Sequence, residues 1–385
     1  MNTYRVIGTG ALAACLALAT GCSAAVESPS TTGGAARACP NSAAADALRS
    51  ATAPYAADSL DLPALTHPNP LRHATVSYIA SGLSFPFSQE VLAGVKSGTS
   101  AAGATVSVSD SGGDPAKAGS LIDQAVSGNA RVILLQGTDP VAVSASIRNA
   151  KNHDIPLVSV AALNPGAVPA ELQAIGVSAI AAAPSDVGTR QADFVAANSG
   201  CAAHVLFVGS STFPTSNADE VQFTSRLARM CPDCKTSTLD SPIAQWPTQL
   251  GPQVNAVLLR NPDISYVVTV VDDMFTSVKP ALQSLAGRQV KLVGNNAVAA
   301  TMQVLKGGLS DPVAATVGTP LRWMGWAAVD QAQRVVAGEP AVAHEPVANR
   351  TFVHSNVKSL DLANPETWYG TFDYQRAYRT LWGIS

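Results

Sequence analysis

Two groups of side chains along the chain have the spacing of reactive sites. Two residues separate Cys231 from Cys234, the spacing of a redox-active dithiol. The neighbours Asp272 and Asp273 are a pair of carboxylates of the kind that general acid–base catalysis uses. A redox pair of this kind opens a helix after a strand, whereas these cysteines close a helix and precede a strand. We therefore expect a structural disulfide in preference to a redox site. The two aspartates are adjacent at a helix start and would not both flank one scissile bond.

Other signatures of catalysis are missing from the sequence. It contains no G-x-S-x-G, no H-E-x-x-H and no G-x-x-x-x-G-K-[ST] motif. The six histidines have no metal-ligand spacing: His67, His73, His153, His204, His344 and His354. With Lys+Arg 24 against Asp+Glu 27 and no basic stripe, nucleic acid is excluded as a partner. We expect a binding protein with no catalytic residue, no cofactor and no metal.

The amino terminus reads as an export signal. Arg5 and the free amine supply a positive end, and an apolar run over 6–19 is too short to span a membrane. Small residues then lead to Cys22, a pattern that resembles the lipobox of bacterial lipoproteins, although Cys15 follows a similar pattern after a very short apolar core. We predict a signal peptide over 1–21 and lipidation of Cys22, with simple secretion as the alternative. Two acyl chains suffice for stable membrane anchoring.

Residues 22–73 are rich in Ala, Ser, Thr and Pro and show almost no periodicity, apart from a possible short helix at 42–51. We interpret this segment as a tether between the membrane and the folded part. Beyond Cys15 and Cys22, four cysteines remain: Cys39, Cys201, Cys231 and Cys234. Outside the cytoplasm they can pair, and four cysteines allow three connectivities.

From residue 75 onward, short apolar strands alternate with amphipathic helices. The expected strands cover 75–81, 105–110, 131–136, 155–160, 204–209, 235–239, 265–271, 290–294 and 314–319. The first four begin roughly 25 residues apart, the length of one strand–helix unit. Asp114-Pro115 and Asp139-Pro140 are helix start signals, with an N-cap acid and proline in the first turn. Two such runs in 385 residues, 47% of them hydrophobic, predict an α/β protein with two doubly wound parallel sheets.

Loops at the ends of these strands carry a resemblance to a known family. The segments are 84–87, 110–117, 136–140, 261–264, 272–274, 293–296 and 318–320. In order and spacing, over residues 74–345, they resemble the ribose-type periplasmic binding proteins, the type I solute receptors of ABC importers. The resemblance implies two lobes joined by a three-crossing hinge and a ligand held in the cleft between them. The chain would cross near residues 180, 319 and 343.

The implied organisation is lobe one at 74–180 plus 320–343 and lobe two at 181–319 plus about 344–360, followed by an aromatic tail at 361–385. By position in the family, five residues would bind the ligand: Phe85, Phe87, Trp246, Asp272 and Asn296. Aromatic rings would stack on the faces of a sugar, and carboxylate or amide groups would bond its hydroxyls. As isolated residues the aromatics also fit a core, Asp272 a helix N-cap and Asn296 a turn.

One departure from the family concerns the ligand. Ala161-Ala162 stand where sugar-binding members carry an Asp-Arg pair, and Val271 replaces a polar residue. Each lost contact removes on the order of 1–3 kcal/mol from sugar binding. We expect a sugar or sugar-like solute that either has fewer hydroxyls than a free sugar or is bound by polar groups at other positions.

The resemblance also implies partners and location. The expected partners are a small polar solute and an ABC permease. The protein is expected to be a monomer, which lipidated Cys22 anchors to the outer face of the cell membrane or which stays in the periplasm. A receptor that feeds a sensory kinase or chemoreceptor would have the same fold and stays open as an alternative. A transcription regulator with this core is contradicted by the export signal.

Overall fold

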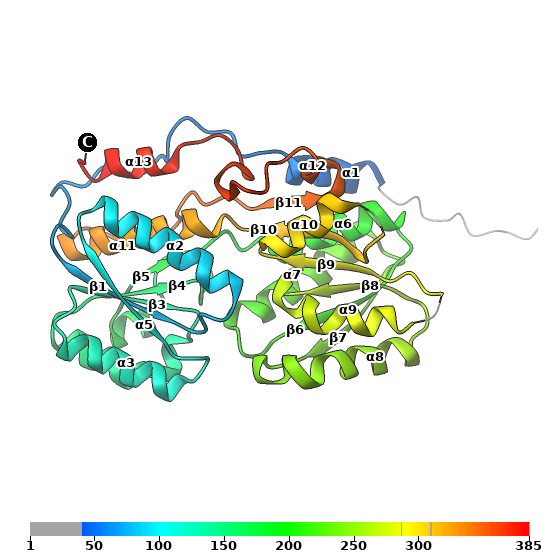
Figure 1. Cartoon of the computed structure of the whole chain (residues 1–385), viewed down its shortest axis with the longest axis horizontal. Helices are drawn as coiled ribbons and strands as arrows, with labels where there is room; N and C mark the ends of the chain where they lie inside the picture. Colours follow the sequence, from blue (N-terminus) through cyan, green and yellow to red (C-terminus); the bar gives the residue numbers. More distant parts are fainter. Residues whose placement is uncertain (1–40, 286, 309, 385) are drawn as a thin grey trace, which may run out of the picture. The chain divides into compact units, whose positions relative to one another are not determined.

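The structure is a computed structural model that describes residues 41–285, 287–308 and 310–384, within one compact unit, Cys39–Ser385. Lobe one is built on a five-stranded sheet in the order β2-β1-β3-β4-β5, with every neighbouring pair parallel (Figure 1). Its strands are β1 (Thr75–Ala80), β2 (Thr105–Asp110), β3 (Val132–Gln136), β4 (Leu157–Val160) and β5 (Val177–Ala181). The helices of this lobe are α2 (Pro86–Ala101), α3 (Pro115–Ser127), α4 (Ser144–Asn152), α5 (Ala170–Ile175) and α11 (Leu321–Ala337), with a 3-10 turn at Pro140–Val143.

Lobe two is built on a six-stranded sheet in the order β11-β10-β9-β8-β6-β7. Its strands are β6 (His204–Gly209), β7 (Lys235–Asp240), β8 (Ile264–Thr269), β9 (Lys291–Asn295), β10 (Val313–Gly318) and β11 (Arg350–Val353). Only β11 runs antiparallel, against β10. The helices are α6 (Val187–Ser199), α7 (Pro214–Met230), α8 (Gly251–Arg260), α9 (Phe275–Gln283) and α10 (Ala299–Gly307). Two parallel α/β sheets were predicted from the alternation of strands and helices, and the structure confirms them.

Local sequence signals explain where the helices of lobe one begin. The Asp114 carboxylate accepts a hydrogen bond from the backbone N–H of Ala116 at 2.8 Å, and α3 then starts at Pro115. The Asp139 carboxylate accepts from the N–H of Val141 at 2.9 Å in the same way. Each acid satisfies a donor that the first turn of a helix leaves free.

Glycines let two pairs of helices approach closely. A Cβ at Gly94 of α2 would lie 2.1 Å from the carbonyl oxygen of Arg322, and one at Gly325 of α11 would lie 2.5 Å from that of Val91. In lobe two, a Cβ at Gly188 of α6 would lie 2.1 Å from the carbonyl oxygen of Asp219 on α7. Glycine is therefore required at these crossings, and the last of them sets the position of Asp219.

The chain passes between the two sheets three times: after β5, between β10 and α11, and between α11 and β11. Two strands were not predicted. These are β5, which is marked only by a short apolar run, and β11. Between β7 and β8, the π-helical turn Trp246–Leu250 leads directly into α8.

Residues 41–73 differ from the expected tether. Helix α1 (Asn41–Thr52) packs on α6, with Ala44 in the core of lobe two. Leu60, Leu65 and Leu71 are buried in the core of lobe one. This segment is part of the folded body, because its few apolar residues each fill a place in a core. The remaining part of the expected tether, and the predicted signal peptide, lie outside the described residues.

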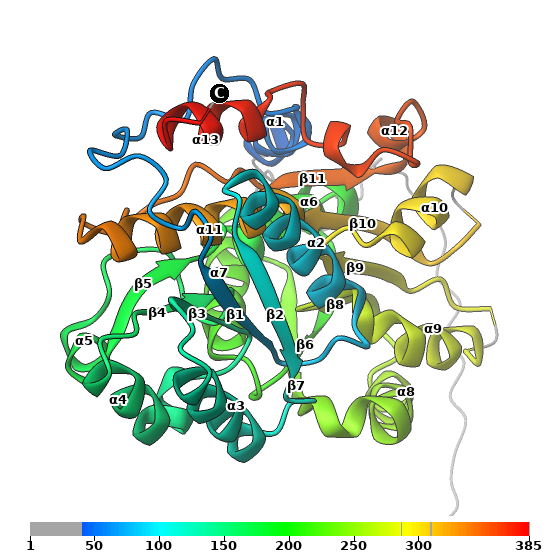
Figure 2. The same cartoon turned by 60° about the vertical axis from the view of Figure 1, so that its left-hand side comes forward.

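The carboxyl-terminal tail also spans both lobes, as Figures 1 and 2 show. After the short helix α12 (His354–Val357) of lobe two, the tail contains a 3-10 turn at Pro365–Thr367 and α13 (Tyr374–Leu381). On lobe one, Trp382 stacks on Trp326 of α11 with ring centroids 5.3 Å apart. The tail runs beside the amino-terminal segment, where the N–H of Tyr55 donates to the carbonyl of Tyr369 at 2.6 Å and Tyr55 bridges Gly370.

Cys231 and Cys234 form a disulfide, as expected, and Cys201 is also disulfide-bonded. Cys22 and Cys39 lie outside the described residues. Within the described part of the chain, no helix has both the length and the apolar character needed to cross a membrane. The same residues include no group of three or more His, Cys, Asp or Glu side chains placed to hold a metal ion.

Candidate functional site

A cavity of about 140 Å³ lies between the lobes, at the carboxyl ends of the strands of both sheets. Lobe one contributes residues that end or follow β1, β3, β4 and β5, and lobe two contributes residues that end or follow β6, β7, β8, β9 and β10. Ligands of parallel α/β sheets bind outside the carboxyl ends of the strands, so this cavity is the candidate binding site. We refer to it below as the cleft.

Aromatic rings form one wall of the cleft. Phe85, at the start of α2, meets Trp246 of lobe two with ring centroids 6.0 Å apart and planes at 70°. Phe213, before α7, lies 5.9 Å from Trp246 on the same lobe. The Trp246 indole is buried and its Nε1–H donates to the carbonyl of Ser241 at 2.8 Å, which fixes the ring. Phe87 also lines the cleft, although it packs against the core of lobe one.

Two carboxylates line the cleft from lobe two: Asp219 on α7 and Asp273 after β8. Burial, with a smaller contribution from the Asp186 carboxylate, raises the pKa of Asp219 to about 7. Burial likewise raises the pKa of Asp273 to about 6. No Lys, Arg or His belongs to the described lining of the cleft. Its only ionisable side chains in the described lining are therefore carboxylic acids, and burial favours the protonated form of both.

Amide groups form the floor of the cleft. Asn295 and Asn296 end strand β9, and both side chains are more than nine-tenths buried. Asn295 Nδ2 donates to the carbonyl of Val270 at 3.1 Å, but Asn295 Oδ1 and Asn296 Nδ2 have no hydrogen-bond partner among the described residues. Asn296 has a φ of +98°, which turns the chain sharply after the strand. Two residues of the cleft lining thus each contain a buried polar atom without a protein partner, one an acceptor and one a donor.

A correction concerns Asp272, which was expected to be the main polar contact of lobe two. It does not line the cleft, and its neighbour Asp273 does. The Asp272 carboxylate accepts from Thr316 Oγ1 at 2.9 Å and from the backbone N–H of Val298 at 3.2 Å, just before α10. Burial raises its pKa to about 8. Asp272 therefore ties β8 to β10 and α10 beneath the cleft.

The family model that describes the periplasmic binding protein domain matches residues 76–340. This chain belongs to the periplasmic binding protein family. The match covers every strand of the two sheets except β11, and the first two crossings between them. The family resemblance predicted from the strand-end loops is thereby confirmed. A comparison with curated proteins finds no match.

Solved structures with the same fold include transporter binding proteins of several bacteria. The 5-methylthioribose transporter solute-binding protein of Thermotoga lettingae, with its ligand, gives a TM-score of 0.68 at 17% identity and covers 83% of this chain and 99% of its own. A sugar ABC transporter protein of Yersinia enterocolitica gives 0.66 at 16% identity, covering 84% and 99%. An Agrobacterium vitis solute-binding protein with bound tagatopyranose gives 0.66 at 19% identity, covering 75% and 98%.

In this periplasmic binding protein, Ala161-Ala162, which stand in place of the Asp-Arg pair of sugar-binding members, lie beside the cleft. Ala161 lines the cavity with a φ of +55°, and its N–H donates to the carbonyl of Ala181. Ala162 is buried and turns away from the cleft lining. The polar groups offered here by lobe one are instead those of Gln136, Ser88 and Asn164. The Gln136 Oε1 is already engaged, because it accepts from Ser81 N and from Ser88 Oγ.

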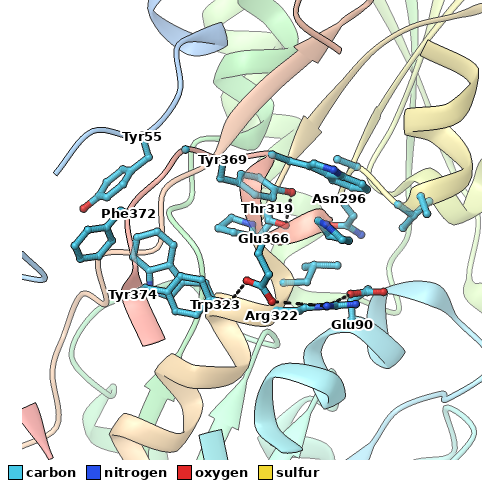
Figure 3. A pocket seen from close by; sticks show the side chains of 18 residues that line it. Tyr55, Glu90, Asn296, Thr319, Arg322, Trp323, Glu366, Tyr369, Phe372 and Tyr374 are labelled. Atoms are coloured by element: carbon cyan, nitrogen blue, oxygen red, sulfur yellow. Dashed lines mark hydrogen bonds and ion pairs between the residues drawn. The ribbon is translucent and has the colours of Figure 1, made fainter. Parts of the chain in front are cut away.

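A second, smaller cavity of about 50 Å³ lies on the tail side, shown in Figure 3. There Arg322 pairs with Glu90 at 2.6 Å and with Glu366 of the tail at 3.7 Å. Tyr369 O–H donates to the carbonyl of Thr319 at 2.8 Å. Thr319 and Asn296 border both cavities. The charged groups of the second cavity are paired with each other, and so the cleft is the better candidate for a ligand.

Sequence reasoning placed Phe85, Phe87, Trp246 and Asn296 at strand ends, and all four line the cleft. It missed Phe213, Asp219 and Asp273. Asp273 was noted only as half of an acidic pair. Asp219 has no sequence signal, because it sits in the middle of a helix pattern and is brought to the cleft by the close crossing at Gly188.

Proposed function

We propose that this protein captures a small polar solute, a sugar or sugar-like molecule, by closure of its two lobes, and delivers it to an ABC permease. The observation that carries the proposal is the cleft itself, which both lobes line at the carboxyl ends of their strands. Free buried amide atoms on its floor and an aromatic wall fit the hydroxyls and the flat faces of such a solute. The protein catalyses no reaction and takes no cofactor.

Closure follows from contacts on both sides of the cleft. A solute that touches Phe85 in lobe one and Trp246 in lobe two stabilises the closed arrangement over the open one by its differential affinity for the two. The closed protein then offers the permease a surface composed of both lobes, and an empty open protein does not. Delivery is thereby coupled to loading.

A thermal-shift screen tests this function. The purified protein would be heated with pentoses, hexoses, polyols, nucleosides and amino acids in turn. A ligand at about 100 times its dissociation constant stabilises the native state by about 2.7 kcal/mol, which raises the melting temperature. Trp246→Phe, which keeps a ring but loses the indole N–H bond to Ser241, should reduce the shift. A hit that Trp246→Phe leaves unchanged would count against the cleft as the binding site.

Anchoring at the outer face of the cell membrane is part of the proposal. It rests on the lipobox-like sequence before Cys22. Mass spectrometry of the mature amino terminus should find a diacylglyceryl modification on Cys22, and Cys22→Ser should release the protein into the medium. An unmodified Cys22 in a membrane-free protein would leave simple secretion in its place.

A further inference from the structure

We propose that the solute carries a positive charge, as an amine on a sugar-sized polar body, and that Asp273 and Asp219 bind that charge. The proposal rests on the proposed function, because it names the class of solute for the same cleft. It departs from a neutral sugar at one point, the charge. Three observations carry it: the unpaired acids, the aromatic wall and the free amide atoms of the floor.

The first observation is the way this chain treats its other buried carboxylates. Asp193 pairs with Arg226 at 2.7 Å, and Asp330 pairs with Arg334 at 2.6 Å, both well buried. Burying a carboxylate without a cation is costly, and these arginines offset the cost. Among the residues that the structure describes, no cation pairs with Asp219 or Asp273. Asp272 is buried with neutral hydrogen-bond donors in place of a cation, but it lies beneath the cleft, whereas Asp219 and Asp273 line a cavity that a ligand can enter.

The surroundings of the two acids reinforce this deficit. The charged neighbour of Asp219 is another acid, Asp186, and that of Asp273 is Asp272. The Asp186 carboxylate already pairs with Arg190 at 2.6 Å. A cationic group that enters the cleft meets negative potential with no competing lysine or arginine on the lining. An anionic solute would meet only repulsion. A bound ammonium group would favour the ionised form of both acids, whereas an anion would find no cationic side chain among the described lining residues.

The aromatic wall is compatible with the same charge. Phe213, Trp246 and Phe85 form a continuous run of rings along the cleft, with centroids 5.9 and 6.0 Å apart. An ammonium group within about 6 Å of a ring centroid is attracted by the negative face of the ring, most strongly by tryptophan. The wall thus adds to the attraction of the acids instead of opposing it.

The floor identifies the rest of the solute. Asn295 Oδ1 is a buried acceptor that needs a donor, and Asn296 Nδ2 is a buried donor that needs an acceptor. An ammonium group donates only, so it cannot satisfy both. A hydroxyl can donate to the first and accept from the second. The acids and the amide atoms together therefore fit an amino alcohol or an amino sugar.

Matched pairs of probes test the charge alone. We would measure dissociation constants by titration calorimetry for D-glucose against 6-amino-6-deoxy-D-glucose, and for D-glucitol against 1-amino-1-deoxy-D-glucitol. The two members of each pair differ only by an amine in place of a hydroxyl. In the full protein, the amine of at least one pair should bind about tenfold more tightly or better, as expected for an ion pair in a partly desolvated site.

Three variants assign the effect to residues. Asp273→Asn and Asp219→Asn keep the size of each side chain and should each remove most of the preference for the amine. Asp233→Asn makes the same change of charge at an exposed position of lobe two, outside the cleft, and should leave the preference unchanged. Melting temperatures of all three verify that they fold.

The outcomes separate this inference from the proposed function. If a neutral probe binds as tightly as its amine, the cationic class is overturned while solute capture stands. An amine preference that survives in both cleft variants overturns the role of Asp219 and Asp273. If no member of either pair binds, both this inference and a polyol-like solute for the cleft are contradicted.

Discussion

The ring of Phe85 meets the ring of Trp246 nearly edge-on, at 6.0 Å, and this contact joins the two lobes across the mouth of the cleft. Phe85 belongs to the chain of lobe one, yet it packs against the hydrophobic core of lobe two. Gly82 makes room for it, because a Cβ there would lie 2.8 Å from the Phe85 ring. The contact is thus built by the loop after β1 and is available only when the lobes are together.

Phe85→Ala should weaken solute binding with little effect on folding. The substitution removes an aromatic pair of about 0.5–1.5 kcal/mol that exists only in the closed arrangement, so affinity should fall by about three- to tenfold. Phe372→Ala, a half-buried ring in the tail-side cavity, is the control and should leave affinity unchanged. Titration calorimetry with any solute found by the thermal-shift screen measures both. Equal losses in the two variants would argue against a specific role for Phe85.

The raised pKa of Asp219 should be detectable in the pH dependence of the free energy of unfolding. Its pKa is about 7 in the folded protein against 3.8 as the ordinary value, so the native state holds the proton more tightly than the unfolded chain between these values. Stability from this group is therefore present at low pH and lost as pH rises towards 7. The free energy of unfolding of the wild type, relative to Asp219→Asn, should fall between about pH 4 and about pH 7. Urea denaturation at a series of pH values measures the difference, and a flat difference would mean that the carboxylate is well solvated.

Substitution of Asp272 should lower the stability of the protein, whereas substitution of its neighbour Asp273 should weaken ligand binding. Asp272→Ala leaves Thr316 Oγ1 and the N–H of Val298 without their acceptor, and should cost about 1–3 kcal/mol of stability. Asp273→Ala removes an acid that has no cation, and should leave stability unchanged or raise it while weakening the binding of an amine. Chemical denaturation and calorimetry on both variants distinguish these effects. The reverse pattern would place Asp272 in the cleft, as the sequence had suggested.

Gly370→Ala should loosen the tail from the amino-terminal segment. Gly370 has a φ of +143°, and a Cβ would lie 2.3 Å from the carbonyl oxygen of Tyr55. The strain and the lost contact should cost roughly 1–3 kcal/mol. Gly307→Ala, where no atom lies within 4 Å of the added Cβ, is the matched control and should be close to neutral. Thermal denaturation measures both, and an unchanged melting temperature in Gly370→Ala would show that this junction adds nothing to stability.

The sequence was informative where a pattern is local. Alternating strands and helices, and caps such as Asp114, depend on neighbours in the chain, and both were predicted correctly. Position in the family then suggested Phe85 and Trp246 as ligand-binding residues, and both line the cleft. What failed depends on distant contacts. Asp272 and Asp273 differ by one position, and the backbone at the end of β8 decides which of them faces the cleft.

The packing of 41–73 failed for a related reason. Its leucines are several residues apart and follow no helical or strand period, so nothing local distinguishes them from a tether. They are buried because α11 and the tail provide places for them. The hydrogen bond from the N–H of Leu71 to Gln333 Oε1 spans most of the chain and has no sequence signal.

The most direct test of the central claim is a crystal structure of the protein with the tightest-binding solute from the screen. We predict electron density for the solute in the cleft, in contact with Phe85 of lobe one and with Trp246 and Asn296 of lobe two. Density in the tail-side cavity, or against one lobe alone, would contradict capture by closure.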